Sequence, residues 1–348
     1  MAPDLFVALR FESDNQRLHF RTVDSCWNQV TSQFGNNSMH NADAGERQVY
    51  LSGMMVPESQ ARISIFDSAV MLGDSLTEST RTFGHVPFRL DDHIRRLFVS
   101  LKVARVDAGL TPEELTRVTL DVLEANRAHM QPEEDCWIVH NISRGLTRPG
   151  PTTGQTNSAT VMIFTSPMDL RGWARYYTEG CHAVTSFSRA VPAQSLDARI
   201  KNRSRLFYTL ADAESRLVDP DAQCVILDTD GYVSENKGGN IFAVIDGELR
   251  TPTTENCLAG ISRQTVIELA ARHGIPCREV RMLPYDLYAA EEVFFTSTPY
   301  CIMPATRFNG LPVGDGRVGP VTQKLLAAWS SLVGTDIVVQ AQRMLRNG

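Results

Sequence analysis

Two side chains that can carry acid–base chemistry frame the stretch from Ser195 to Ile245. Lys201 follows Ser-Leu-Asp-Ala-Arg-Ile, and Glu235 stands 34 residues later (235 − 201 = 34), between a strand-like run and a glycine loop. A helix expected over 203–217 and a strand expected over 223–227 are long enough to bring the two side chains together. A lysine amine can bond an aldehyde, and a carboxylate can keep a ring nitrogen protonated. A pyridoxal phosphate enzyme requires this pair.

The segments around both residues resemble those of the class IV aminotransferases, which are fold type IV pyridoxal phosphate enzymes. The likeness is carried by Ser195-Leu-Asp-Ala-Arg-Ile-Lys201-Asn and by Glu235-Asn-Lys-Gly-Gly-Asn240-Ile-Phe, whose Lys237 and Gly238 depart from the commoner Gly-Ser. It extends from about Ser64 to Trp329. The resemblance implies that Lys201 is the catalytic residue and holds pyridoxal 5'-phosphate as a Schiff base. It also implies that Glu235 binds the ring nitrogen of the cofactor.

The residues alone allow plainer interpretations of both side chains. Most lysines are solvated surface groups, and a glutamate at the end of a strand is ordinary. For proton transfer Lys201 must be neutral during part of the cycle, and burial beside a cation favours this by lowering its pKa.

Three segments could hold the cofactor phosphate. Gly260-Ile-Ser-Arg263 opens a helix, where exposed amides favour an anion. Phe295-Thr-Ser-Thr298 resembles a small-residue turn of the family, and His93-Ile-Arg-Arg96-Leu matches its His-x-x-Arg-Leu motif. From helical spacing alone, both arginines of that motif lie off the apolar stripe, where solvation is the default. The cofactor-binding residues that the resemblance implies are Arg96, Ile261, Ser262, Ser297 and Thr298.

The resemblance also implies substrate-binding residues. Arg144 aligns with the arginine that binds the substrate carboxylate in D-amino-acid aminotransferases, Arg81 stands where a side chain often enters the same pocket, and Thr77 replaces an aromatic residue. A guanidinium can bind a carboxylate through two parallel hydrogen bonds. Either arginine could instead pair with a buried Asp or Glu. Leu206 stands where branched-chain enzymes carry a tyrosine, and the C-terminal half looks closest to (R)-amine transaminases.

The composition excludes several other classes of protein. The 348 residues carry a net charge of −6 with no basic run, which argues against a nucleic-acid surface. No apolar run approaches the ~18 residues of a membrane span. Seven cysteines without a CxxC pair favour reduced thiols in the cytoplasm, and the histidines show no metal-ligand spacing.

The pattern of elements, with the resemblance, predicts an α+β fold of two domains, similar to D-amino-acid aminotransferase, with the cofactor in the interdomain cleft. The domains expected are 48–168 and 174–348, after an N-terminal extension, 1–47, to which no role is assigned. Strands are expected over 49–51, around 56 and over 61–66, 136–142, 159–165 and 293–298. A loop is expected over 148–154. Helices are expected after an Asp91 or Asp92 cap, after the Thr111–Glu114 capping box, and over 262–273 and 320–332. Asp246-Gly247 predicts a hairpin.

The expected activity is transfer of an amino group between an amino acid or (R)-amine and a 2-oxo acid, with a homodimer or larger assembly by analogy. Two alternatives stay open. A lyase of the aminodeoxychorismate type would share the fold, the lysine and the glutamate, but would release pyruvate. A non-catalytic pyridoxal phosphate-binding protein would not need Glu235.

Overall fold

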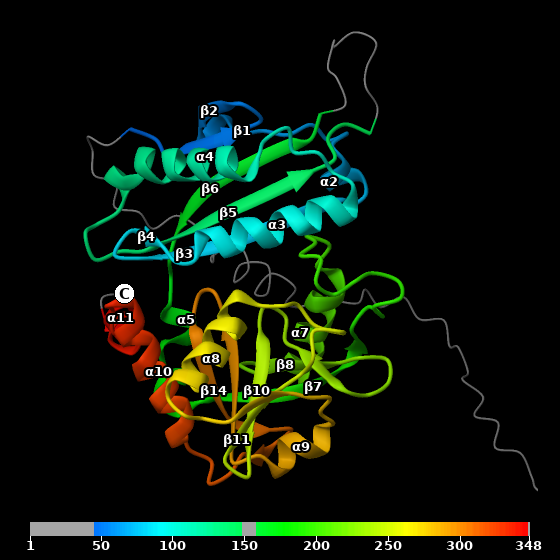
Figure 1. Ribbon diagram of the computed structural model, residues 1–348, viewed down its shortest axis with the longest axis vertical. Coiled ribbons are helices and arrows are strands. Elements are labelled where there is room, and N and C mark those ends of the chain that lie inside the picture. Colours follow the sequence, from blue (N-terminus) through cyan, green and yellow to red (C-terminus); the bar gives the residue numbers. More distant parts are fainter. Residues whose placement is uncertain (1–44, 148–157, 347–348) are drawn as a thin grey trace, which may run out of the picture. The chain divides into compact units, whose positions relative to one another are not determined.

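The computed structural model describes residues 45–147 and 158–346. Its strands form two sheets, one of six strands in the order β2-β1-β6-β5-β3-β4 and one of nine, in which β12-β11-β10-β13-β14-β7-β8-β9 are adjacent and β15 pairs with β14. Helices pack on both sheets (Figure 1). This mixture confirms the α+β class. Residues 1–44 of the predicted N-terminal extension 1–47 lie outside the described residues. The whole of the predicted loop 148–154 also lies outside them. The domain limits 48–168 and 174–348 stay predictions.

The six-stranded sheet is antiparallel at every pairing. Its strands are β1 (Gln48–Leu51), β2 (Met54–Pro57), β3 (Ser75–Phe83), β4 (Val86–Pro87), β5 (Cys136–Ser143) and β6 (Thr160–Pro167). Helices α3 (Leu90–Ala104) and α4 (Pro112–Ala125) lie side by side along one face of this sheet (Figure 1). Their apolar stripes bury Ile94, Leu97 and Leu115 against Ile138 and Ile142 of β5.

The two helices begin differently. Thr111 and Glu114 form the predicted capping box of α4, with Pro112 at the first helical position. The prediction that Asp91 or Asp92 caps α3 is wrong, because the residue before the helix is Arg89, with φ of 55° and no capping side chain. Both aspartates lie in the first turn, where a negative charge is favourable at the positive end of the helix dipole.

The strand expected over 61–66 is absent. Residues 61–64 have no assigned structure and Ile65 and Phe66 lie in a turn, followed by the short helix α2 (Ser68–Met71). Ile63, Ile65 and Phe66 are exposed, so no strand or core within residues 45–147 and 158–346 covers the apolar run. Hydrophobicity without a partner does not make a strand.

The second sheet contains β7 (Cys181–Arg189), β8 (Gln223–Leu227), β9 (Val233–Glu235), β10 (Asn240–Ile245), β11 (Glu248–Thr251), β12 (Cys277–Glu279), β13 (Glu292–Ser297), β14 (Cys301–Phe308) and β15 (Leu311–Pro312). It is mixed, because β7 runs parallel to both β8 and β14, and β11 parallel to β12. Asp246 and Gly247, both with positive φ, form the predicted hairpin between β10 and β11.

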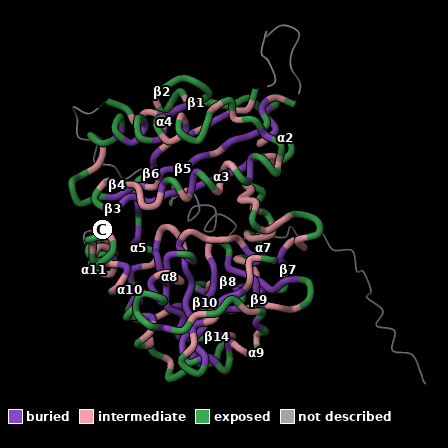
Figure 2. The backbone as a smooth tube through the Cα atoms, in the orientation of Figure 1, coloured by how far each residue is buried: buried purple, intermediate pink, exposed green. Residues whose placement is uncertain are grey.

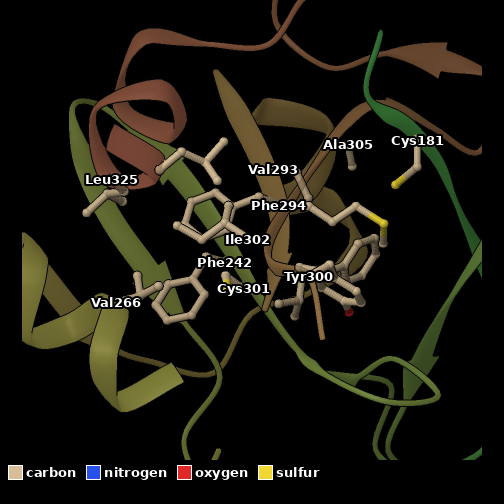
Figure 3. Packing of buried hydrophobic residues seen from close by; sticks show 14 of the residues in the cluster. Cys181, Phe242, Val266, Val293, Phe294, Tyr300, Cys301, Ile302, Ala305 and Leu325 are labelled. Atoms are coloured by element: carbon tan, nitrogen blue, oxygen red, sulfur yellow. The ribbon is translucent and has the colours of Figure 1, made fainter. Parts of the chain in front are cut away.

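The helices of this half are α5 (Arg171–Ala174), α6 (Tyr176–Glu179), α7 (Leu206–Val218), α8 (Ile261–Arg272), α9 (Pro284–Ala289), α10 (Pro320–Val333) and α11 (Ile337–Arg346). Figure 3 shows Val266 of α8 and Leu325 of α10 beside Phe242 of β10 and Phe294 of β13. The two phenyl rings stack with 5.1 Å between centroids. The central strands of both sheets are buried along most of their length (Figure 2). They give the loops at their ends a rigid base.

Candidate active site

Lys201 and Glu235 line one pocket, as their spacing predicts. The other polar groups that line it include Asn202, Arg205 and Tyr208. Its apolar walls are formed by Ala190, Val191, Leu196, Ala198, Ile200 and Phe207. Asp197 and Asn256 also line it, so half of the lining residues are polar or charged. Apolar walls with convergent polar groups are the usual form of a ligand site.

The backbone of Lys201 is fixed by the first sheet. The amide of Thr77 in β3 donates to the Lys201 carbonyl at 2.9 Å, and the amide of Arg203 donates to the Ser75 carbonyl at 2.8 Å. Leu76 and Asn202 form the bridge between these contacts. The lysine segment thus pairs with the start of β3, while Lys201 and its neighbours Ile200 and Asn202 line the pocket.

The surroundings of Lys201 favour the neutral form of its amine. Burial lowers the pKa of its amine to about 8; Glu78 and Glu235 oppose this shift, whereas Arg96 and Arg205 add to it. No hydrogen-bond partner of its amine occurs among the described residues. A lysine in this state is partly neutral near pH 8 and can act as a nucleophile or base.

Glu235 ends β9 and is buried. The hydroxyl of Tyr208 donates to its Oε1 at 2.5 Å, and the amide of Leu258 donates to its Oε2 at 3.1 Å. Burial raises the pKa of Glu235. The hydrogen bonds from Tyr208 and Leu258 and the nearby charges of Arg205 and Lys201 lower it, but they offset the rise only in part. The carboxyl group can therefore take up or share a proton.

A second buried carboxylate, which sequence reasoning missed, lies in β3. Glu78 accepts from Arg96 Nε at 2.9 Å and from Arg96 Nη2 at 2.7 Å, and its Oε1 lies 3.0 Å from Nδ1 of His93. Burial pushes the pKa of Glu78 upward, but Arg96 and His93 outweigh it and hold the pKa well below its usual value. The available signal was a lone glutamate between two small polar residues of a buried strand.

Arg96 also reaches the start of α8. Its Nη1 donates to the Ala259 carbonyl at 2.8 Å, two residues before Ile261 opens the helix. Gly260 precedes the helix without a capping side chain, and a β-carbon on it would overlap Asn240 Oδ1. No acceptor for the Ile261 and Ser262 amides occurs among the described residues. An arginine beside free helix amides can bind an anion.

The other two predicted phosphate contacts, Ser297 and Thr298, lie at the end of β13. The Ser297 hydroxyl donates to the Gly238 carbonyl at 2.6 Å, in the loop after Glu235, and the Thr298 hydroxyl donates to the Ser79 carbonyl of β3 at 3.4 Å. Neither these residues nor Arg96, Ile261 and Ser262 line the pocket of Lys201. Ser297 instead contacts the loop after Glu235, and Thr298 and Arg96 contact β3, the strand of Glu78. Ile261 and Ser262 follow Ala259, whose carbonyl accepts from Arg96.

Arg144 is half-exposed and its donors are occupied. Nε donates to Asp74 Oδ2 at 2.8 Å, and the two other nitrogens donate to the carbonyls of Ala104 and Arg105, each at 3.0 Å. These carbonyls end α3, so the arginine caps that helix. Asp74 is 31% exposed, so this pair differs from the predicted alternative of a buried Asp or Glu, and the role of Arg144 in substrate binding stays a prediction.

Arg81 and Thr77 lie in β3 and are buried. Arg81 donates to the Pro299 carbonyl at 2.7 Å and to Gln340 Oε1 at 2.9 Å, and the Thr77 hydroxyl donates to the His140 carbonyl at 3.0 Å. Neither side chain lines the Lys201 pocket, and their role in substrate binding stays a prediction. Leu206 is exposed, and the tyrosine hydroxyl at the pocket comes instead from Tyr208.

No helix of the described ranges is long and apolar enough to cross a membrane. Within residues 45–147 and 158–346, no three His, Cys, Asp or Glu side chains are grouped so that they could hold a metal ion.

Comparison with known proteins gives a consistent result. The model of the amino-transferase class IV family matches residues 75–308. The putative branched-chain-amino-acid aminotransferase of Methanocaldococcus jannaschii is 33% identical over 280 residues, which are 80% of this chain and 93% of the relative.

Solved structures agree. The branched-chain amino acid aminotransferase of Escherichia coli superposes with a TM-score of 0.75 at 30% identity, over 83% of this chain and 95% of the other. The branched-chain enzyme of T.th., solved with pyridoxamine 5'-phosphate, also gives 0.75, at 27% identity, over 84% and 96%.

Proposed function

This chain belongs to the class IV amino-transferase family, and from that premise we propose that it moves an amino group from an amino acid or amine to a 2-oxo acid, with pyridoxal 5'-phosphate as cofactor. The fold type predicted from the sequence is that of the family. One observation carries the proposal. Lys201, with a pKa lowered to about 8, and Glu235, with a raised pKa, line the same pocket.

The residues present fit the cofactor. Lys201 offers an amine for the aldehyde, Glu235 a buried carboxyl group for the ring nitrogen, and Arg96 a cation beside the open amides of Ile261 and Ser262. Ser297 and Thr298 are the proposed hydroxyl contacts. When bound, pyridoxal phosphate supplies a ring that accepts electrons from the carbon bearing the amino group.

The chain's own residues then hold and move protons. The neutral Lys201 amine can act as a general base and accept at Nζ the proton that leaves the substrate carbon. The resulting ammonium group can then act as the general acid that donates this proton later in the same transfer. Glu235 can keep a proton at the ring nitrogen, and the Tyr208 hydroxyl fixes the direction of its Oε1. The apolar walls of the pocket keep water away from the amine of Lys201 and the carboxyl group of Glu235. Electrostatic contacts made by these two groups are therefore stronger than in water.

For the amino donor we propose an amino acid with an apolar side chain. The support is the apolar lining and the names of the relatives, which are branched-chain aminotransferases. A second candidate is an (R)-amine without a carboxylate. It is favoured by the engagement of Arg81 and Arg144 with other groups of the chain, which leaves neither guanidinium turned to the pocket.

The test is the absorbance of the protein loaded with pyridoxal phosphate, followed after adding one donor at a time. The donors are L-leucine, D-alanine, L-glutamate and (R)-1-phenylethylamine. We expect one of them to shift the band from about 410–420 nm to about 330 nm, and 2-oxo acid acceptors to reverse it. Lys201→Ala lacks the amine and should show neither band change, and its circular dichroism spectrum should match that of the wild type. Release of pyruvate without an acceptor would favour the lyase, and a band that no donor moves would favour the non-catalytic binding protein.

A further inference from the structure

The donors of Arg81 are directed to other groups of the protein. Its side chain is 1% exposed and lies over the ring of Phe83, with 3.9 Å from Cζ to the centroid. Nη1 donates to the Pro299 carbonyl at 2.7 Å, and Nε donates to the Thr82 carbonyl at 3.2 Å. A buried guanidinium with this many acceptors has a fixed direction.

The C-terminal helix α11 sets that direction through Gln340. The amide oxygen of Gln340 accepts from Arg81 Nη2 at 2.9 Å, and its amide nitrogen donates to Asp135 Oδ2 at 2.7 Å. The guanidinium itself forms only a long ion pair with that carboxylate, 3.7 Å from Nη2 to Oδ2. Gln340 is therefore a spacer between a buried cation and a buried anion that would otherwise approach each other.

The turn that receives Arg81 connects β13 to β14. Ser297 and Thr298 contact the Glu235 loop and β3, and Cys301 has a φ of 58°, a left-handed conformation that is uncommon outside glycine. Tyr177 also donates to the Tyr300 carbonyl at 2.8 Å. The turn is thus held at two consecutive carbonyls, by Arg81 and by Tyr177.

We propose that Gln340 and Arg81 are positioning residues for the turn 297–301. By separating Arg81 from Asp135, Gln340 directs the guanidinium to Pro299, and this contact fixes Ser297 and Thr298 where the cofactor phosphate binds. The inference rests on the proposed function for the phosphate contacts. It adds a device from α11, which lies beyond the residues 75–308 that the family model matches.

Removing the amide should close the ion pair. In Gln340→Leu, Arg81 and Asp135 lose the group between them, and their attraction in a buried setting draws the guanidinium away from Pro299. Because Ser297 and Thr298 are then held less firmly, cofactor affinity falls. The expected change is that of about one buried hydrogen bond, about 3- to 10-fold in the Kd for pyridoxal phosphate.

The experiment measures the Kd for pyridoxal phosphate of the full chain by absorbance titration. Gln342→Leu is the matched control, because Gln342 lies on the same helix and is partly buried as Gln340 is, and its side chain has no hydrogen bond among the described residues. Gln340→Met, which keeps the side-chain length, serves if Gln340→Leu fails to fold. The Kd of the control should stay within about 2-fold of wild type.

A double variant separates positioning from packing damage. Gln340→Leu with Asp135→Asn removes the charge that draws Arg81 away, so affinity should return to within about 2-fold of wild type. Equal Kd values for Gln340→Leu, Gln342→Leu and wild type would overturn the inference, and so would a double variant that binds no better than Gln340→Leu. If the wild-type protein takes up no pyridoxal phosphate, it is the proposed function that fails.

Discussion

Two glutamates, one in each sheet, are buried near Lys201, and their pKa values are shifted in opposite directions. Glu78 of β3 faces the charged groups of Arg96 and the ring of His93, and its pKa is held well below the usual value. Glu235 of β9 faces a tyrosine hydroxyl and a backbone amide, and its pKa is raised. Burial disfavours charge at both sites, so the partners decide the outcome.

The difference assigns different work to the two carboxyl groups. Glu78 is a permanent anion that fixes Arg96, since a bidentate guanidinium contact has one geometry. Glu235 has no paired cation among the described residues and can exchange a proton with a ligand. The site therefore has a charged end, at Glu78 and Arg96, where the carboxylate stays ionised. It also has a neutral end, at Glu235 and Tyr208, where the carboxyl group can share a proton.

The largest expected effect comes from breaking the charged end. Glu78→Gln leaves Arg96, which is 12% exposed, without its buried anion, and we expect the free energy of unfolding to fall by about 3 kcal/mol. Urea denaturation at pH 7 measures it. Glu124→Gln, at an exposed pair 3.4 Å from Arg127, is the control and should cost less than about 1 kcal/mol. A loss at Glu78 as small as at Glu124 would remove the distinction between the two glutamates.

The wild-type contribution of Glu78 has a definite sign with pH. Because its folded pKa is below the usual value of 4.5, this stability is present above pH 4.5 and is lost as pH falls through the folded pKa. The stabilities of wild type and Glu78→Gln should therefore converge in acid.

The next effect concerns the neutral end. Glu235→Gln keeps the volume but can no longer exchange a proton, and we expect turnover to fall by about 10²-fold, or about 2.7 kcal/mol in activation free energy. Stability should change by less than in Glu78→Gln, because the folded protein already disfavours the charged form. Steady-state kinetics and urea denaturation of the same preparation check both. Unchanged turnover would contradict the proposed role of Glu235.

A smaller expected effect is the pH dependence of stability that Lys201 causes, which can be measured without cofactor. Both glutamates influence the pKa of this lysine. Its pKa falls from 10.5 in the unfolded chain to about 8 in the fold, so between pH 8 and 10.5 the unfolded chain binds more protons and stability rises with pH. The slope is at most about 1.4 kcal/mol per pH unit, and Lys201→Met should lack it. Unfolding of both apoproteins at pH 8, 9 and 10 tests this. Parallel curves would mean that Lys201 is solvated.

The smallest effect is expected at Tyr208. Burial raises the pKa of Glu235 and the Tyr208 hydrogen bond offsets part of that rise, so Tyr208→Phe should raise the pKa further and cost about 1 kcal/mol of stability. Phe207→Leu, at a neighbouring wall position, controls for packing. A pH–rate profile should show the acid limb of Tyr208→Phe displaced to higher pH, and that of Phe207→Leu in the wild-type position.

The sequence predicted the elements that carry their own signals. The capping box of α4, the Asp246-Gly247 hairpin and the approach of Glu235 to Lys201 follow from local residues or from resemblance. Sequence reasoning missed Glu78, because its partners come from a helix whose rotation against β3 is set by packing. It also missed α11, whose role depends on Gln340 meeting Arg81, 259 residues earlier. The strand predicted over 61–66 is wrong for the converse reason, since its apolar residues find no partner strand in the part of the chain that the structure describes.

The pairing of the Lys201 segment with β3 has a consequence for local opening. The Thr77 amide donates to the carbonyl of the reactive lysine itself, and the Arg203 amide donates to Ser75, so a strand of the first sheet carries the backbone whose side chain enters the pocket beside β9. The Lys201 segment cannot separate from β3 without breaking both bonds. Hydrogen exchange at Thr77 and Arg203 should therefore proceed only through an opening that also displaces Lys201, which makes the backbone of the reactive lysine part of one cooperative unit with β3.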